Sequence, residues 1–149
     1  MPRFRFNLDP LLKHRKRIEG DKQRALAVLE RRRLEIENHI REMQQRIADN
    51  KAELGRSLLG AVDTAAIRSQ AAMSMQLDAQ TRRLVLVLAE VYRRIERARA
   101  ELLEARTRAK AIDRLRDRRY DDWRRALSKR ESAAVDDLTT IRAAWRVES

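Results

Sequence analysis

The sequence predicts an all-α protein: a long antiparallel two-helix coiled-coil hairpin that forms a single domain over residues 1–149. Charged residues make up 39% of the chain and aromatic residues only 4%, with three glycines and two prolines. This composition is typical of long helices and coiled coils. Apolar residues also recur at three- and four-residue steps along most of the chain, which places them on one face of a helix.

The first helix is expected over about residues 10–54. Asp9 and Pro10 make a good start, because aspartate caps unpaired amide groups and proline fits the first helical position. The steps around Ile40 depart from a strict heptad, so relaxed supercoiling is expected there. The predicted seam consists of Ile18, Ala25, Leu29, Ile36, Ile40, Met43, Ile47 and Leu54, with the polar residues Lys22, Arg32 and Asn50 among them.

A turn is expected over about residues 55–70. Gly55 and Gly60 are stop signals, and Asp63 or the threonine after it offers a new cap. The second helix is expected over about residues 71–145, since no glycine or proline follows Gly60. The apolar spacing that predicts its seam runs through Ile67, Ala71, Leu77, Leu84, Leu88, Val91, Ile95, Ala98, Leu102, Ala105, Ala109 and Ile112, and less strictly through Tyr120, Trp123, Leu127, Leu138, Ile141 and Trp145.

The two predicted helices are expected to pack on each other. An amphipathic helix must bury its apolar stripe, and the nearest partner is the next helix in the chain. The alternative is a parallel homodimer of long helices. The glycines between residues 55 and 60 favour the hairpin, because a parallel dimer gains nothing from a break there.

The net charge of +12 is unevenly distributed. Residues 1–33 hold eleven basic and four acidic residues, and residues 93–125 hold thirteen and seven, whereas residues 55–81 hold two of each. An antiparallel hairpin would bring the two basic segments together at the end near the termini. Such a surface suits an anionic partner, which leaves nucleic acid, anionic lipid and an acidic protein open.

Residues 113–125, DRLRDRRYDDWRR, concentrate arginine, aspartate and two aromatic residues. Arg118 reaches Asp121 and the next aspartate at three- and four-residue steps, so the charges compensate one another on a solvated helix face. Tyr120 and Trp123 continue the apolar seam. A coiled coil that binds nucleic acid, or a structural scaffold, stays as the alternative function, although no specific nucleic-acid motif is present.

No pattern of catalytic residues, cofactor-binding residues or metal ligands is found, so the chain is not expected to be an enzyme or to need a cofactor. It has no cysteine, and its two histidines, His14 and His39, stand apart. The usual metal, phosphate-loop and nucleophile motifs are missing. The first residues lack the apolar run of a secretory signal, and the run at residues 84–89 is too short to span a bilayer. A cytoplasmic protein is expected.

Two apolar features exceed what a two-helix seam needs. Val85 and Val87 fall outside the stripe of their helix, and Met73 and Met75 lie beside the turn. One explanation is a tip segment that folds back as a short extra helix. The other is a docking surface for a partner protein, to which flexible methionine side chains are suited.

Both ends of the chain resemble the flagellar export protein FliJ family. The first part, FRFNLDPLLKHRKRIEGDKQRALA, has an aromatic-basic lead, a leucine pair and a basic turn before alternating charge and alanine. The later part, RLRDRRYDDWRRALSKRESAAVDDL, has a basic run, an acidic pair, an aromatic residue and a late acidic pair before leucine. The resemblance covers nearly the whole chain.

The resemblance implies a fold like the central stalk subunit of rotary ATPases and a role in the flagellar type III export apparatus. The implied partners are the hexameric export ATPase, the cytoplasmic domain of the export-gate membrane protein and export chaperones, at the inner face of the cell membrane. No specific nucleic acid is expected. We expect the basic end to contact the ATPase ring through Arg15, Arg17, Arg114, Arg118 and Arg119, and the tip to contact the gate through Ile67, Met73, Met75 and Leu77. Family members often carry aromatic residues at the tip, but this chain has none between Phe6 and Tyr92. A virulence-type secretion relative would share these features.

Overall fold

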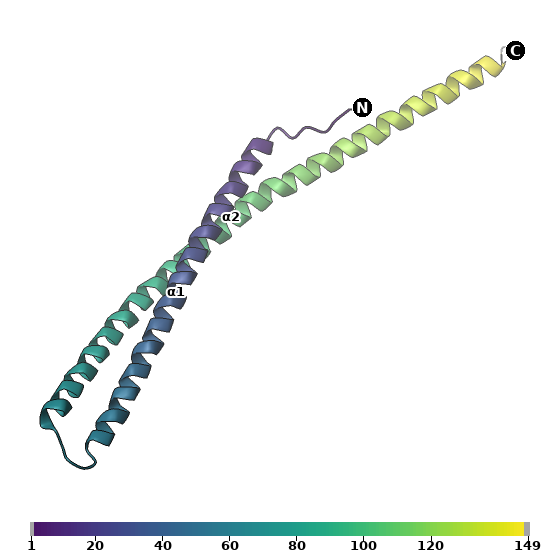
Figure 1. Ribbon diagram of the computed structural model, residues 1–149. Helices are drawn as coiled ribbons and strands as arrows, with labels where there is room; N and C mark the ends of the chain where they lie inside the picture. The colour runs from purple at the N-terminus through teal and green to yellow at the C-terminus, as the bar shows by residue number, and fades with distance from the viewer. Residues whose placement is uncertain (1, 148–149) are drawn as a thin grey trace. The chain divides into compact units, whose positions relative to one another are not determined.

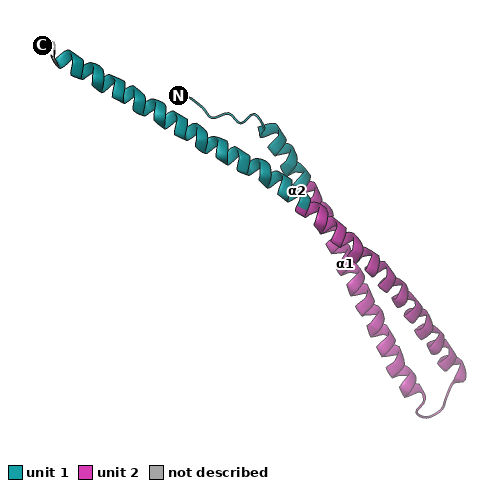
Figure 2. Ribbon diagram, turned by 180° about the vertical axis from the view of Figure 1, so that it is seen from behind, with its two compact units in different colours: residues 1–19, 104–149 teal, residues 20–103 magenta. Residues whose placement is uncertain are grey.

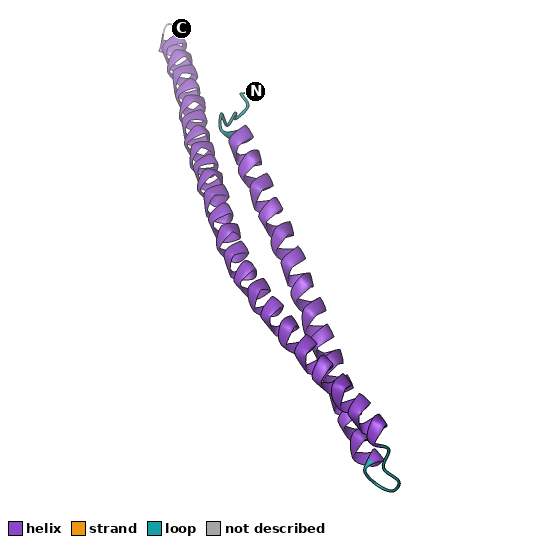
Figure 3. Ribbon diagram, turned by 90° about the vertical axis from the view of Figure 1, so that its left-hand side faces the viewer, coloured by secondary structure: helices purple, strands orange, loops and turns teal. Residues whose placement is uncertain are grey.

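The computed structural model describes residues 2–147, with side chains through residue 146. Two helices, α1 (Asp9–Ser57) and α2 (Thr64–Val147), pack against each other and are joined by residues 58–63 (Figure 1). Helix and loop are the only elements of this part of the chain (Figure 3). The predicted all-α helical hairpin is therefore confirmed. An extra helix at the tip is not formed within residues 2–147, and α2 begins several residues earlier than predicted.

The start of α1 differs from the prediction. Asp9 is the first residue of the helix and not its cap, because the N–H of Leu12 already donates to the carbonyl oxygen of Leu8 at 2.9 Å. The Asp9 carboxylate instead pairs with Lys13 Nζ at 3.2 Å. A negative charge in the first turn also complements the positive end of the helix dipole.

The turn between the helices depends on Gly60 and Asp63. Helix α1 continues through Gly55, and Gly60 has a φ of 101°, which side chains other than glycine rarely allow. Asp63 caps α2 as one of the two expected candidates. Its Oδ1 accepts hydrogen bonds from the backbone N–H groups of Ala65 and Ala66 at 3.0 and 3.4 Å.

The chain divides into two compact units (Figure 2). Unit 2, residues 20–103, contains the turn and the parts of both helices that flank it. Unit 1 combines residues 1–19 with residues 104–149. By sequence, unit 1 holds nineteen basic and eleven acidic residues, a net charge of +8, and unit 2 holds sixteen and twelve, a net charge of +4.

The core of unit 2 is a cluster of β-branched side chains. Ile36 and Ile40 of α1 pack with Val91 and Ile95 of α2, and Ile95 is only 1% exposed. The leucines packed around this cluster are Leu26, Leu29, Leu84 and Leu88. Burying each such side chain contributes about 1.5–3 kcal/mol, so this cluster holds the two helices together.

The seam of α1 in unit 2 follows an unbroken heptad, contrary to the expected irregularity. The seam positions are Lys22, Leu26, Leu29, Arg33, Ile36, Ile40, Met43, Ile47, Asn50 and Leu54, at alternating four- and three-residue steps, and each of them is buried or half-buried. Ala25 and Arg32, which were predicted for this seam, are exposed. The shift by one residue buries the large Leu26 in place of the small Ala25, which removes more apolar surface from water.

A polar layer interrupts the seam of unit 2 near the turn. Asn50 is 7% exposed, and its amide Nδ2 donates to the backbone oxygen of Gln70 at 2.8 Å and to the hydroxyl of Ser74. A buried asparagine that bonds only at one alignment of the helices specifies their register. The sequence identified this position as polar but did not supply its partners.

The core of unit 1 is thinner than that of unit 2. Leu12 of α1 is 2% exposed, and the buried residues of α2 in this unit are Ala105 and Ala109. Small side chains allow the helices to approach closely but bury little apolar area. An ion pair from Arg106 Nε to Glu19 Oε1, at 3.3 Å, also links the helices here.

Candidate functional site

The residues predicted for the coiled-coil seam lie where the helices meet, except Trp123, which contacts Phe4 of the segment before α1. Each of them is buried or half-buried: Ile18, Leu29, Ile36, Ile40, Met43, Ile47, Leu54, Leu84, Leu88, Val91, Ile95, Leu102, Ile112 and Trp123. Most of their surface is taken up by packing between the helices. The surfaces left open to a partner are the grooves, which Met43 and Leu84 help to line, and the outer faces of the two helices.

The arginines predicted to contact an ATPase ring all belong to unit 1. Arg15 and Arg17 come from the first turns of α1, and Arg114, Arg118 and Arg119 come from α2. Arg15 is half-buried and the other four are exposed. Unit 1 is thus the more basic part of the molecule, with guanidinium groups from both helices open to an acidic partner.

A cluster of aromatic side chains holds the N-terminal segment against α2 in unit 1. The ring of Phe4 lies 5.3 Å from that of Tyr120 and 5.9 Å from that of Trp123, between centroids. Arg119 lies over the ring of Phe6, with Cζ 5.9 Å from the centroid. Such contacts are worth about 0.5–1.5 kcal/mol per aromatic pair. The extended segment before α1 therefore covers part of the α2 seam.

Sequence reasoning missed the role of this segment. Residues 4–6, Phe-Arg-Phe, place two aromatic side chains on one side of an extended chain, a period-two signal that was available. What was missing was their partner. The structure supplies it as Tyr120 and Trp123, which are stacked on each other at 5.8 Å.

The last part of α2 lies in unit 1 and has no helix covering it. Residues 128–146 are all exposed, including Leu138 at 60%, Ile141 at 54% and Trp145 at 74%. These three were predicted to continue the buried seam, and that prediction is wrong. Helix α1 begins only at Asp9, so it is too short to lie alongside this part of α2.

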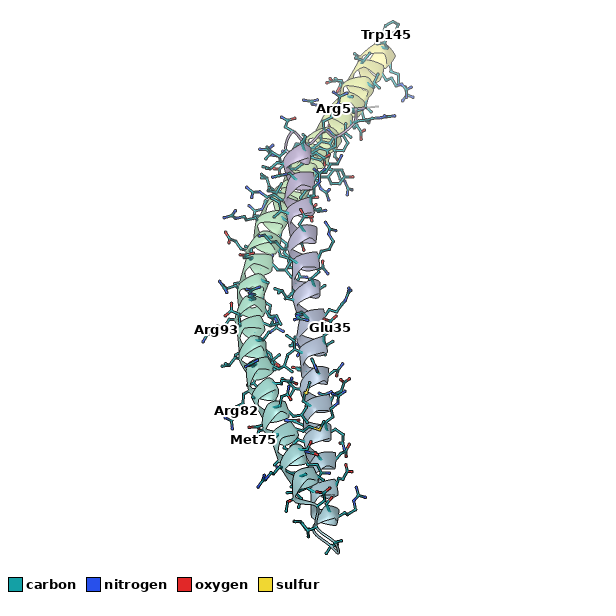
Figure 4. All side chains as sticks on the ribbon, turned by 60° about the vertical axis from the view of Figure 1, so that its left-hand side comes forward. Arg5, Glu35, Met75, Arg82, Arg93 and Trp145 are labelled. Atoms are coloured by element: carbon teal, nitrogen blue, oxygen red, sulfur yellow. The ribbon has the colours of Figure 1, made fainter. Side chains whose placement is uncertain are left out.

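The four residues predicted for the tip do not form one surface. Ile67 is half-buried and Leu77 is 9% exposed, because both occupy the seam. Met73 lines a groove beside α1, together with Arg46, Asp49, Asn50, Glu53 and Leu77. Met75 is 75% exposed on the side of α2 that faces away from α1 (Figure 4). The side chains of Met73 and Met75, only two residues apart, therefore lie in different surroundings.

The two long sides of unit 2 also differ. On one side the helices are cross-linked, since the Tyr92 hydroxyl donates to Glu37 Oε1 at 2.6 Å and Arg99 pairs with Glu30 at 3.6 Å. Hydrogen bonding with Tyr92 raises the pKa of Arg33 above its ordinary value, with Glu37 and Glu30 adding to the effect, so this seam residue stays charged.

On the other side a groove continues along the helices. Beyond the part beside Met73, it is lined by His39, Met43, Gln80, Arg83, Leu84 and Val87. We call these two adjoining stretches the lateral groove. It combines methionine, leucine and valine with scattered polar groups, which is the composition of an adaptable protein-binding surface.

No described residue belongs to a cluster of three or more histidine, cysteine, aspartate or glutamate side chains that could hold a metal ion. Within the described helices, none is long and apolar enough to cross a membrane. The basic residues of unit 1 and the lateral groove of unit 2 are surfaces suited to binding.

These features define a class: a long helical hairpin with a basic unit and a lateral groove. The particular family follows from its sequence. The model of the flagellar FliJ protein family matches residues 4–148, so the chain belongs to that family. Membership implies a component of the flagellar export apparatus. Neither a curated relative nor a solved structure matches the chain.

Proposed function

We propose that this protein couples the hexameric flagellar export ATPase to the export gate and assists export chaperones, at the inner face of the cell membrane. The observation that carries the proposal is the gathering of basic residues from both helices in unit 1, in a chain of the FliJ family. An ATPase ring would take unit 1, and the cytoplasmic domain of the gate protein would take unit 2. The protein itself carries out no reaction.

The ring contact is proposed to use Arg15 and Arg17 of α1 with Arg114, Arg118 and Arg119 of α2. Exposed guanidinium groups can form bidentate pairs with carboxylates of a partner. The uncovered apolar positions of α2 beyond residue 128 offer additional contact area in the same unit. The expected result of binding is a higher rate of ATP hydrolysis by the ring.

The test of the ring contact is charge reversal in the full-length protein. The triple variant Arg114→Glu, Arg118→Glu and Arg119→Glu should weaken binding to the purified export ATPase by at least about tenfold, since close interfacial charge pairs contribute about 1.5 kcal/mol or more. It should also abolish stimulation of hydrolysis. A matched variant, Arg31→Glu, Arg41→Glu and Arg56→Glu in unit 2, changes the net charge equally and should bind normally. Equal loss in both variants would show a general charge effect and would remove this contact.

The gate contact is proposed to lie in the lateral groove around Met73 and Leu77 of α2. Met73→Asp places a charge in the groove, whereas Met75→Asp places the same charge on the opposite side of the same helix. Only the first should weaken binding to the cytoplasmic domain of the gate protein and reduce motility. If Met75→Asp weakens gate binding equally, the groove is not the contact surface.

A further inference from the structure

The outward side of α2 in unit 2 carries an uninterrupted exposed ridge. Its residues follow alternating four- and three-residue steps: Arg68, Ala72, Met75, Ala79, Arg82, Leu86, Ala89 and Arg93. All eight are exposed, with Leu86 at 72%. We call this set the outer ridge. It contains arginine, apolar and small residues and not one acidic residue, so it is both basic and apolar along its whole length.

The arginines of the outer ridge share one direction. Arg82 and Arg93 are eleven residues apart, so they differ by only about 20° around the helix and lie about 16 Å apart along it. Figure 4 shows both of them, with Met75, on the side of α2 that faces away from α1. Leu86 lies between the two arginines on the same stripe.

Positive charge at the two ends of this ridge is not neutralised locally, although Arg82 in its middle is paired. The nearby acidic residues already have partners: Asp78 pairs with Arg82 at 2.9 Å, and Glu90 pairs with Arg94 and Arg97. Among the arginines of α2 within residues 64–103, Arg68, Arg83 and Arg93 form no ion pair with a residue of the described chain, so two of the three ridge arginines are unpaired. The ridge therefore presents free guanidinium groups next to exposed apolar side chains.

The outward side of α1 in the same unit is mixed in chemistry. One exposed stripe there consists of Glu35, Asn38, Glu42, Gln45 and Asp49, and the exposed residues beside it include Arg31, Leu34 and Arg41. Figure 4 shows Glu35 on the side away from α2. On the outward side of α1 carboxylates thus lie beside the arginines, whereas the eight residues of the outer ridge include no carboxylate.

We propose that the outer ridge of α2 is a binding site for an anionic phospholipid surface, with α1 turned toward the aqueous side. Guanidinium groups bind lipid phosphates in bidentate geometry, while Met75 and Leu86 enter the headgroup layer between them. A partner helix fits less well, because it would bury the unpaired Arg68 and Arg93 and each of them would need a carboxylate opposite. At a membrane surface, by contrast, arginine head groups stay in contact with water while neighbouring apolar side chains contact the lipid, so both kinds of side chain are accommodated at one depth. This site is independent of the ATPase and gate contacts.

The chain has no cysteine, so single labels report depth without ambiguity. Full-length Ala79→Cys and Leu86→Cys variants would carry a nitroxide on the ridge, and Asn38→Cys and Gln45→Cys would carry it on α1. With vesicles of equal parts phosphatidylglycerol and phosphatidylcholine, the ridge labels should become accessible to oxygen and shielded from a water-soluble relaxation agent. The α1 labels should stay aqueous. Pure phosphatidylcholine vesicles should change neither.

Matched charge variants separate this site from general attraction of a basic protein. Arg68→Gln with Arg93→Gln removes the two unpaired arginines of the ridge and should lower partitioning onto the anionic vesicles about 25-fold, because each arginine at the surface contributes about fivefold. The pair Arg31→Gln with Arg41→Gln on α1 removes the same charge at more than about one Debye length from the membrane surface. This pair should lower partitioning onto the anionic vesicles less than twofold. Leu86→Gln should weaken binding even at high salt, unlike Leu34→Gln on α1.

Three results would overturn the proposal. Equal loss in the two arginine pairs would assign the binding to net charge. Ridge labels that become immobile with rising protein concentration, without vesicles, would assign the ridge to a second copy of this chain. Absence of binding to the anionic vesicles by the unaltered protein would remove the site altogether.

Discussion

Two parts of α2 have the same kind of sequence pattern, but only one of them is buried. Around Ile95, the apolar stripe is covered by α1 and the isoleucine is 1% exposed; around Ile141, the stripe is uncovered and the isoleucine is 54% exposed. Both stripes have helical spacing. This difference shows that apolar periodicity in the sequence identifies the apolar face of a helix, whereas burial of that face depends on whether a second helix packs against it.

The sharpest test of this comparison is the same truncation at both sites. Ile95→Ala should lower the free energy of unfolding by about 2–5 kcal/mol, because it leaves a cavity in the core of unit 2. Ile141→Ala should change it by less than about 0.5 kcal/mol. Urea denaturation followed by circular dichroism at the helix band measures both. Similar losses would mean that the end of α2 is covered in solution.

A smaller effect is expected at the polar layer of the covered region. Asn50→Ala removes the hydrogen bonds to Gln70 and Ser74 and should cost about 1–2 kcal/mol in the same denaturation experiment. Gln45→Ala, on the exposed face of the same helix, is the control and should be nearly neutral. If both variants unfold at the same urea concentration as the unaltered protein, the polar layer does not contribute to stability.

The aromatic cluster around Phe4 is intermediate in burial between the region around Ile95 and the region around Ile141. Phe4→Ala should cost about 1 kcal/mol and expose Trp123, because the ring of Phe4 contacts both Tyr120 and Trp123. A red shift of tryptophan emission in a Trp145→Phe background reports the exposure. Phe4→Leu keeps apolar contact and should shift the emission less. An unchanged spectrum in Phe4→Ala would show that the N-terminal segment leaves α2 in solution.

The smallest effect is expected at the exposed cross-links between helices. A double-mutant cycle on Arg99 and Glu30 should give a coupling of about 0.2–1 kcal/mol, falling with salt, because both side chains are largely solvated. Coupling above that range, or coupling insensitive to salt, would show that this side of unit 2 is drier than the structure indicates.

Much of the fold could be predicted from particular residues. The cluster of Ile36, Ile40, Val91 and Ile95 follows from apolar residues at three- and four-residue steps, and the cap at Asp63 follows from its place between Gly60 and the next apolar run. The register error at Ala25 and Arg32 has a physical cause. Alanine is small and arginine is long and amphipathic, so neither residue marks the buried face of a helix clearly. The seam predicted from the sequence is therefore displaced by one residue at these two positions.

The candidate surfaces were less accessible to sequence reasoning. The five arginines lie in basic stretches of the sequence, and their presence in one unit follows from antiparallel packing. Met73 and Met75 could not be separated without the rotation of α2, because two residues along a helix differ by about 200°. The outer ridge also needed that rotation. Its spacing is visible in the sequence, but which stripe faces outward depends on the partner helix.

The sequence by itself determined that the chain forms two long helices with a break between them, because composition, spacing and local caps are properties of short stretches. Only the tertiary structure decided which stripe of each helix is covered, where the N-terminal segment docks and where α2 is left uncovered. Those outcomes depend on the lengths and relative rotation of two helices, since a side chain is buried only when another part of the chain reaches it.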